Sequence, residues 1–511
     1  MAPQIQDHLL ALFTFFLSMI VAIMMIRKNT RKTLTPTYIP PGPWKLPIIG
    51  NIPHLVTSLP HRKLRDLALT YGPLMHLQLG ELFIIVVSSA EYAREVMKTH
   101  DVTFASRPYL LASDIASYNS TNIAFSPYGY YWRQLRKICA TELLSSKRVK
   151  SLWPIREEEI TTLIKWIASK EGLEINLTQA VESIIYTITS KAAFGKKYEE
   201  QEEFVTAAKQ LMKLGGGFSI GDLFPSAKWL QSISGMRPKL EKMHQIVDKI
   251  LENIINDHKE TRPREKEALN EAEEDLIDVL LKFEDRNNDM GFRLTSNNIK
   301  AIILDIFSAG SETAGSTIDW VMAEMIKNPR ILKKAQVEVR EVCGKRGKVD
   351  ESAIAELKYL KAVIKEVLRL HPPGPLLLPR ECREACEING FNIPVKSKVI
   401  VNAWAIGRDP KYWTEPDKFY PERFIDSSID YKGTNFEYIP FGAGRRICPG
   451  INYGMANVEE VLAFLLFHFD WRLPNGIKNE DLDLTEEFGV SVARKCDLYL
   501  IPTVSSPLAI T

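Results

Sequence analysis

The sequence predicts one large, mainly α-helical domain with small β-sheets, carried behind a single membrane-spanning helix. Helical patterning dominates residues 130–370, strand-like segments occur near 74–87 and 375–405, and one long apolar run lies near the N-terminus. No stretch after residue 50 is long or soft enough to mark a domain boundary. We therefore expect one body, although 511 residues would allow several domains.

The composition excludes several classes of protein. Hydrophobic residues make up 45% and charged residues 25% of the chain, which allows a large core and excludes wholesale disorder. The 65 Lys and Arg residues nearly balance 63 Asp and Glu residues, so the strong basic excess of a nucleic-acid-binding protein is missing. Six scattered cysteines do not make a disulfide scaffold.

The N-terminal apolar run predicts a membrane anchor. Residues 9–26 include only two polar side chains, Thr14 and Ser18. A helix of this length reaches about 27 Å, which suits the thin membrane of the endoplasmic reticulum. The alternative, a cleaved signal peptide, would need a basic segment before the run, whereas the only charge there is Asp7.

The charges that flank this run predict its orientation. Four basic residues follow it, at positions 27, 28, 31 and 32, and positive charge stays on the cytosolic side. We therefore expect residues 1–8 in the lumen, the anchor at 9–26, a basic stop and proline-rich hinge at 27–50, and residues 51–511 in the cytosol. The prolines make this hinge a stiff, extended spacer.

The next elements follow from local patterns. Residues 74–87 alternate in polarity around a turn and predict a β-hairpin. Ser88 and Glu91 have the spacing of a capping box, which predicts the start of a helix. Residues 259–275 are dense in charge and predict a solvated connector between helices.

The second half of the chain contains the longest helical pattern. An apolar helix is expected from about Asn297 to Met325, and a small β-rich zone from 375 to 405, with 399–401 as its clearest strand. A last helix is expected at 451–468.

A cysteine lies in a Gly- and Pro-rich loop just before this last helix. The segment is Phe441-Gly-Ala-Gly-Arg-Arg-Ile-Cys448-Pro-Gly450. A helix N-terminus and nearby arginines lower the pKa of a thiol, and glycines let the backbone approach a flat ligand closely. A thiolate held in this way can bind iron, although a buried structural cysteine is the alternative for any single Cys.

This segment matches the pattern F-x-x-G-x-R-x-C-x-G, and the chain therefore resembles the cytochrome P450 family. The resemblance implies that Cys448 is the axial ligand of the iron of haem b, that Phe441 belongs to the haem loop and that Arg446 contacts a haem propionate. The other five cysteines are expected to be ordinary thiols. Cys382 and Cys386 are four residues apart, but they lack a second pair of ligands, so a zinc site is not expected there.

A second match lies on a helix before this loop. Glu366 and Arg369 are three residues apart and share one helix face, which alone is a common surface pair. The family has an E-x-x-R helix followed by a P-E-R-F segment, and Arg423 lies in such a segment here. The resemblance implies that these three residues form a buried structural network behind the haem loop.

The long apolar helix carries the third match. Ala309, Gly310, Glu312 and Thr313 fit the oxygen groove of the family, A/G-G-x-D/E-T. Small hydroxyl residues and a Gly within a helix can kink it, although close helix packing is an alternative reading. The resemblance implies that Ala309 and Gly310 border the haem, and that Thr313 passes protons with Glu312 nearby. Ala314 stands where the family usually has Thr or Ser, which removes one hydroxyl.

Three further basic or aromatic positions complete the resemblance. Trp132 and Arg136 match a W-x-x-x-R helix and share one face, so they are expected to hold a haem propionate. Arg380 is another propionate candidate by family position. Arg133 and Lys137 lie about 100° further around the helix, where they offer charge to an acidic redox partner or simply form a solvated face.

The likeness covers the chain from the anchor to the last helix and is closest to plant microsomal members of the A-type clan. It implies a monooxygenase that receives NADPH electrons from a membrane-bound flavoprotein, NADPH–cytochrome reductase, with a b-type cytochrome as a second candidate donor. The substrate is expected to be a small hydrophobic molecule, a terpenoid first and a flavonoid or alkaloid next. The candidate pocket wall comprises residues 301–313, 376–378, part of 107–126, and Val490, with Asp305 and Glu312 as its few charges.

Two other functions stay open at this point. A haem-thiolate isomerase or dehydratase would rearrange peroxides without dioxygen, but such relatives tend to lack the helix threonine found here as Thr313. A haem-binding protein without catalysis would have no use for the oxygen groove. Both alternatives share the expected bond between Cys448 and iron.

Overall fold

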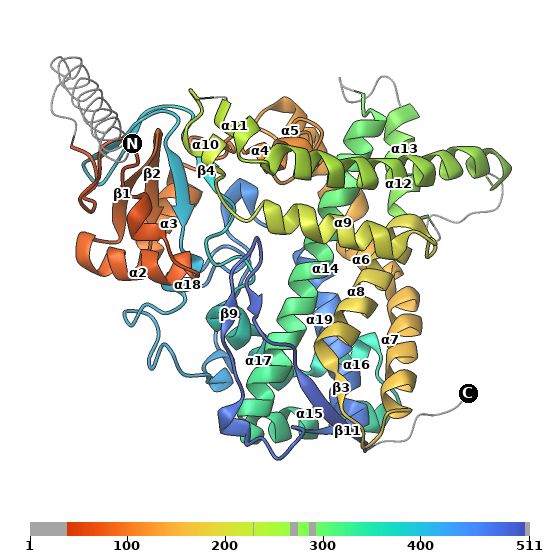
Figure 1. Cartoon of the computed structure of the whole chain (residues 1–511). Coiled ribbons are helices and arrows are strands. Elements are labelled where there is room, and N and C mark those ends of the chain that lie inside the picture. Colours follow the sequence, from red (N-terminus) through yellow and green to blue (C-terminus); the bar gives the residue numbers. More distant parts are fainter. Residues whose placement is uncertain (1–37, 228, 266–273, 286–292, 506–511) are drawn as a thin grey trace, which may run out of the picture.

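One long helix runs through the middle of the fold. The computed structural model describes residues 38–227, 229–265, 274–285 and 293–505, and helix α14 (Ser296–Lys327) crosses its centre (Figure 1). Thr295 caps this helix, because its hydroxyl accepts from the Asn298 amide while the Asn298 side chain accepts from the Thr295 amide. Most of its side chains are buried, which is expected of a helix that is apolar on all sides.

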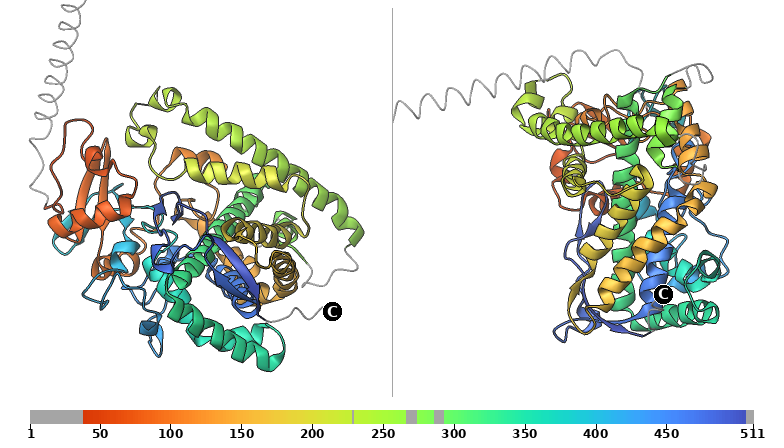
Figure 2. Two further views of the ribbon diagram at one scale, coloured as in Figure 1. Left: turned by 60° about the horizontal axis from the view of Figure 1, so that its bottom comes forward. Right: turned by 90° about the vertical axis from the view of Figure 1, so that its right-hand side faces the viewer.

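Other helices enclose α14. Helix α8 (Leu177–Phe194), α17 (Lys358–Leu370) and α19 (Ile451–His468) pack against it, and α19 has the bounds that its sequence pattern predicts. Figure 1 and the left view of Figure 2 show β1 (Leu74–Leu79), β2 (Leu82–Val87) and α2 on one side of the molecule and the helices around α14 toward the other. The remaining α-helices of the described residues are α2 (Pro60–Tyr71), α3 (Ala90–Arg94), α4 (Leu111–Ala116), α5 (Tyr130–Ile138), α6 (Ser146–Ser151), α7 (Trp153–Ala168), α9 (Gln201–Leu214), α10 (Ile220–Leu223), α11 (Trp229–Ile233), α12 (Met236–Glu265), α13 (Leu276–Asp285), α15 (Pro329–Arg346), α16 (Glu351–Glu356) and α18 (Ala403–Ile406).

The strands form small sheets, as expected. A four-stranded sheet has the order β1-β2-β7-β4, in which β1 and β2 are the predicted hairpin and β7 pairs with β2 in parallel. The other sheets are β3-β11-β8 and the hairpins β5-β6 and β9-β10. The strands are β1 (Leu74–Leu79), β2 (Leu82–Val87), β3 (Ile175–Asn176), β4 (Arg380–Glu381), β5 (Cys386–Ile388), β6 (Phe391–Ile393), β7 (Lys398–Val401), β8 (Phe469–Arg472), β9 (Glu486–Glu487), β10 (Ala493–Arg494) and β11 (Tyr499–Val504).

Two local predictions differ from the structure. Ser89, not Ser88, caps α3, since its hydroxyl accepts from the Tyr92 amide. The charged stretch that begins at Lys259 is helical as far as Glu265, because α12 continues through it; Lys and Glu are good helix formers on a solvated face. Residues 266–273 lie outside the described part of the chain.

The expected membrane anchor also lies outside the described residues. Residues 9–26 fall within the undescribed segment 1–37. Within the described segments, none of the helices is both long enough and apolar enough to span a bilayer.

Candidate functional site

The cysteine loop is held in shape by its backbone. The Cys448 amide donates to the Phe441 carbonyl at 3.0 Å, and α19 begins three residues later. Gly444 has a φ of +69°, and a Cβ at this position would lie 2.1 Å from the Met97 carbonyl oxygen. Any side chain there would therefore both strain the turn and push the loop away from Met97.

The Cys448 thiol differs from the sequence prediction in one respect. We expected the helix N-terminus and the arginines to favour the thiolate, but burial dominates and raises the pKa of Cys448. The Gly450 amide and the charge of Arg136 act in the opposite direction. A metal ion deprotonates a coordinating thiol outright, so burial does not prevent ligation.

Helix α14 presents accessible surface inside the fold. Ala309 is exposed, and Gly310, Glu312 and Thr313 are partly exposed, although most residues of the helix are buried. The Thr313 hydroxyl donates to the Ala309 carbonyl at 2.7 Å. Because other helices surround α14, accessible surface at these positions indicates open space within the protein.

Four guanidinium groups gather beside the cysteine loop without matching carboxylates. They belong to Arg107, Arg136, Arg380 and Arg446. Burial lowers the pKa of all four, to about 10 for Arg380 and about 9 for Arg446, and the nearby positive charges lower those of Arg107 and Arg446 further. Among the described residues, Asp101 is the only carboxylate that pairs with any of them, 3.5 Å from Arg380.

This excess of buried positive charge fits a haem group with its two propionates. Arg446 stacks over the Trp132 ring, with its Cζ 4.1 Å from the ring centroid, and donates to the carbonyls of Ala105, Ile123 and Ser126. The Trp132 indole donates to the Ile123 carbonyl at 3.1 Å. Carbonyl oxygens satisfy these donors but do not neutralise their charge, which an anionic partner would.

Arg107 is a site residue that the sequence analysis did not single out. Its guanidinium is buried and donates to the carbonyls of Ala124, Leu378 and Pro379 at 2.7–2.9 Å. It thereby ties the loop after α4 to the segment that leads into Arg380. In the sequence it lies between Ser106 and Pro108, which gives no sign of a site, and only the fold shows that it lies close to Arg446.

Glu366, Arg369 and Arg423 form one buried network. Both carboxylate oxygens of Glu366 accept from Arg369 at 2.8 Å, and one also accepts from Arg423 at 3.0 Å. The Tyr420 amide adds a further hydrogen bond to Glu366 at 2.8 Å. Every charge here has its partner within the chain, and the remaining Arg369 donors reach backbone carbonyls.

Glu312 lies in a polar corner beside Thr313. Burial raises its pKa to about 7, the nearby Lys209 lowers it and Glu182 raises it further. Tyr186 on α8 and Ser491 in the β9–β10 hairpin both donate hydrogen bonds to this carboxyl group, the latter at 3.5 Å. A carboxyl group with a pKa near neutrality can both accept and release protons.

The other predicted positions divide between buried and exposed faces. Arg133 and Lys137 on α5 are exposed, whereas Trp132 on the same helix is buried. Ala301 is buried, while residues 376–378 and Val490 are only partly buried. Asp305 accepts from the Asn122 side chain at 2.6 Å and from the Ala124 amide at 2.9 Å, so it anchors the loop after α4.

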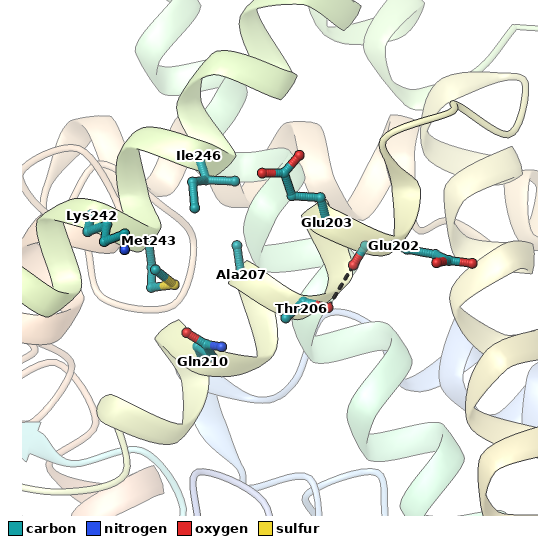
Figure 3. Close-up of a pocket in the computed structure, with 8 residues that line it drawn as sticks. All are labelled: Glu202, Glu203, Thr206, Ala207, Gln210, Lys242, Met243 and Ile246. Atoms are coloured by element: carbon teal, nitrogen blue, oxygen red, sulfur yellow. Dashed lines mark hydrogen bonds between the residues drawn. The ribbon is translucent and has the colours of Figure 1, made fainter.

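A separate groove of about 360 Å³ lies between α9 and α12. Figure 3 shows its lining, which consists of Glu202, Glu203, Thr206, Ala207, Gln210, Lys242, Met243 and Ile246. None of the predicted site residues lines this groove, and it is not part of the candidate site.

Comparisons with known proteins agree with this arrangement. Residues 40–499 match the family model described as Cytochrome P450. The chain is 68% identical to cytochrome P450 71D11 of Lotus japonicus, covering 96% of this chain and all of the relative, and 53% identical to premnaspirodiene oxygenase of Hyoscyamus muticus, covering 95% and 96%.

Among solved structures, a zebra fish cytochrome P450 crystallised with abiraterone superimposes with a TM-score of 0.74 at 24% identity, over 88% of this chain and all of that one. This likeness concerns the fold alone. The match of residues 40–499 and the near full-length plant relatives show that the chain belongs to the cytochrome P450 family.

Proposed function

We propose that this haem-dependent monooxygenase oxidises a small hydrophobic terpenoid, with Cys448 as the axial ligand of the iron. The observation that carries the assignment of the site is the juxtaposition of the partly buried Cys448 thiol with four guanidinium groups, three of them buried, which have a single carboxylate partner among the described residues. Haem bound there supplies the activation of dioxygen, for which NADPH is the electron source.

The residues that would hold the haem come from several elements. Cys448 and Phe441 belong to the haem loop, and Ala309 and Gly310 on α14, which are exposed and partly exposed, would border the haem. Trp132, Arg136, Arg380 and Arg446, joined by Arg107, would neutralise the propionates. Glu366, Arg369 and Arg423 would stiffen the segment behind the loop.

Glu312 and Thr313 would move protons towards the reaction site. Glu312 exchanges protons near neutral pH, and the Thr313 hydroxyl can turn from the Ala309 carbonyl to a reacting oxygen. Position 314 carries an alanine, so Thr313 is the hydroxyl available at this point of the helix.

Two observations support a terpenoid substrate. The candidate wall residues 376–378 and Val490 are apolar and partly exposed, and Asp305 is engaged by Asn122 and Ala124 rather than left for a ligand. A relative with 53% identity is named for the oxidation of premnaspirodiene, a terpene hydrocarbon. A flavonoid or an alkaloid is the next candidate class.

The sequence also supports a location and a partner. The apolar run at 9–26 and the basic residues after it would anchor the protein in the endoplasmic reticulum membrane, with the catalytic domain in the cytosol. The exposed Arg133 and Lys137 offer positive charge to an acidic flavoprotein reductase, and a b-type cytochrome could use the same face.

The test is expression with a plant reductase in yeast microsomes. Premnaspirodiene, a flavonoid and an alkaloid serve as probes, and C448A serves as the blank. NADPH-dependent oxygenated product from the terpene, lost in C448A, is the expected result. If only the flavonoid or the alkaloid gave a product, the terpenoid assignment would be wrong and the substrate would belong to that other class.

The remaining outcomes decide between reaction types. Turnover of a peroxide without NADPH would indicate the isomerase or dehydratase alternative, and haem binding without dioxygen consumption would indicate a non-catalytic protein. We expect C448A to lose the red-shifted carbonmonoxy band, and its retention would contradict the proposed ligand.

A further inference from the structure

A buried polar cluster lies behind the β9–β10 hairpin and has no part in the roles described so far. It consists of Glu486 on β9, His61 on α2, His371 after α17, and Trp404 and Arg408 in and after α18. Every one of these side chains is less than one-tenth exposed. Side chains that are so polar and so deeply buried require a complete set of hydrogen-bond partners.

One oxygen of Glu486 has its partners within the protein. Oε2 accepts from His61 Nε2 at 3.1 Å and from Arg62 Nε at 2.9 Å. Although burial would raise the pKa of Glu486, these two hydrogen bonds hold it at about 2. The carboxylate is therefore ionised, and its second oxygen, Oε1, is a strong acceptor.

His371 presents a second acceptor to the same space. Its ring stacks on Trp320 with centroids 3.9 Å apart, and Nε2 lies 2.8 Å from Glu324 Oε1. Burial lowers the pKa of His371, so the ring is neutral and its one proton lies on Nε2, where it is donated to Glu324. Nδ1 therefore carries a lone pair.

These two acceptors face each other across a gap. His371 Nδ1 lies 4.0 Å from Glu486 Oε1, and neither atom has a hydrogen-bond partner among the described residues. Two acceptors cannot bond to each other, whereas one water molecule can donate a proton to each. Two hydrogen bonds of about 2.8 Å from one oxygen span about 4 to 4.6 Å at ordinary angles.

Two donors of the same cluster also lack partners among the described residues. Trp404 Nε1 and one terminal nitrogen of Arg408 have no partner in the described part of the chain, and Arg408 lies 4.1 Å over the Trp404 ring. The charge of Arg408 acts on both His371 and Glu486. A water between the two acceptors makes two hydrogen bonds with them, and a buried water usually makes about three.

This cluster holds one end of a hairpin whose other end reaches the reaction site. Glu486 pairs with Arg494 across the hairpin, and Arg494 lies 3.5 Å from Asp319 on α14. At the tip, Ser491 donates to Glu312 at 3.5 Å. The hairpin therefore connects Glu486 with the part of α14 that carries Glu312, where Ser316 and Trp320 also donate to the Val492 carbonyl.

We propose that Glu486, His371 and one tightly bound water form a buried clamp that fixes the β9–β10 hairpin over the reaction site. Glu486 and His371 are then positioning residues, since they act on the substrate through the hairpin. They help to decide which carbon of the substrate is presented for oxidation. This last consequence rests on the proposed function; the clamp itself does not.

The water is tested by a high-resolution crystal structure of the haem-loaded protein. We expect ordered density within hydrogen-bond distance of both His371 Nδ1 and Glu486 Oε1. A direct contact between the two side chains, or apolar packing that leaves no density between them, would overturn the bound water.

The clamp is tested by hydrogen exchange of the haem-loaded protein in Glu486→Gln. The matched control is Glu487→Gln, the same change one residue further along β9 at an exposed side chain. We expect amides 489–494 to exchange at least about fivefold faster in E486Q and unchanged in E487Q. Equal exchange in E486Q and wild type would contradict the clamp. If E486Q does not yield folded protein, Trp404→Phe takes its place in this test. This variant removes only one hydrogen-bond donor, so we expect a smaller increase in the exchange rate of amides 489–494.

The effect on selectivity has its own readout. With premnaspirodiene as the probe, E486Q should change the ratio of product isomers at least about twofold at equal haem content, whereas E487Q should not. A lower yield of haem protein with an unchanged product ratio would show that Glu486 stabilises the fold but does not affect selectivity. If premnaspirodiene is not oxidised by the wild type, the proposed function fails, while the crystal structure and the exchange data still decide on the clamp.

Discussion

Two buried charge clusters flank the candidate haem loop, and they solve the problem of burial in opposite ways. In the first, Glu366 accepts from both Arg369 and Arg423, so charge is matched within the chain. In the second, Arg107, Arg136, Arg380 and Arg446 share one carboxylate, that of Asp101. The matched cluster needs nothing from outside, whereas the unmatched cluster requires an anionic partner.

This difference separates residues that build the fold from residues that receive a ligand. A buried ion contributes to folding only when its partner is present. Removing a member of the matched cluster should therefore damage the protein itself, and removing a member of the unmatched cluster should chiefly damage haem retention. Glu312 and Asp305 extend the same comparison to negative charge, because burial raises the pKa of both carboxyl groups and neither forms an ion pair among the described residues.

The largest effect is expected for Glu366→Gln. This change leaves Arg369 and Arg423 buried without their carboxylate, at a cost of about 3–5 kcal/mol of folding free energy. We expect little soluble protein and almost no carbonmonoxy band per cell. Glu415→Gln, an exposed carboxylate nearby, is the control. A wild-type yield of E366Q would show that the network is dispensable.

Arg446→Gln should separate haem loss from unfolding. The Gln side chain can still donate to one of the carbonyls that Arg446 reaches, but it carries no charge for a propionate. We expect wild-type amounts of polypeptide and about tenfold faster haem transfer to an acceptor protein. Arg445→Gln, its exposed neighbour, should behave as wild type. If the polypeptide were lost together with the haem, Arg446 would be needed for folding, as the residues of the matched cluster are.

Glu312→Gln tests a carboxyl group held near neutrality by burial. A group with a pKa of about 7 is protonated below that pH, so proton delivery in the wild type should slow as the pH rises through about 7. We expect E312Q to turn over about tenfold more slowly, with a flat profile in this range and more hydrogen peroxide per NADPH. Glu182 is half-exposed and its charge raises the pKa of Glu312, so Glu182→Gln should keep the fall in rate with rising pH but shift it to lower pH. If the turnover rate of E312Q still fell as the pH rose through about 7, the titrating group would be a residue other than Glu312.

Sequence patterns located those features that short spacing defines. Glu366 and Arg369 are three residues apart, and the last helix follows from a continuous apolar pattern, so both could be predicted. The N-cap of α3 could not, because Ser88 and Ser89 are adjacent hydroxyl residues and only the backbone decides which one faces the free amides.

Contacts between distant segments were beyond reach. His61, His371 and Glu486 are each more than a hundred residues apart, and nothing in the sequence around any one of them predicts the other two. Arg107 was missed for the same reason. The thiol of Cys448 was assigned by its motif, yet its raised pKa depends on burial, which local sequence does not reveal.

The smallest effect is expected at Asp305, where burial raises the pKa to about 6 although Ala124 and Asn122 donate hydrogen bonds to it. Because the folded pKa exceeds the unfolded value, this group stabilises the fold fully below about pH 4, and the contribution is lost as the pH rises through about 6. Asp305→Asn cannot ionise and removes this dependence.

The urea midpoints of the wild type and D305N, measured at several pH values, test this sign. Between pH 5 and 7.5 we expect the wild type to lose about 1 kcal/mol relative to D305N. If the wild type instead gained on the variant as the pH rose, hydrogen bonding would outweigh burial at Asp305. Asp305 would then belong with Glu366, as an acid whose partners within the chain are sufficient, and the unmatched class would be confined to the groups around the haem.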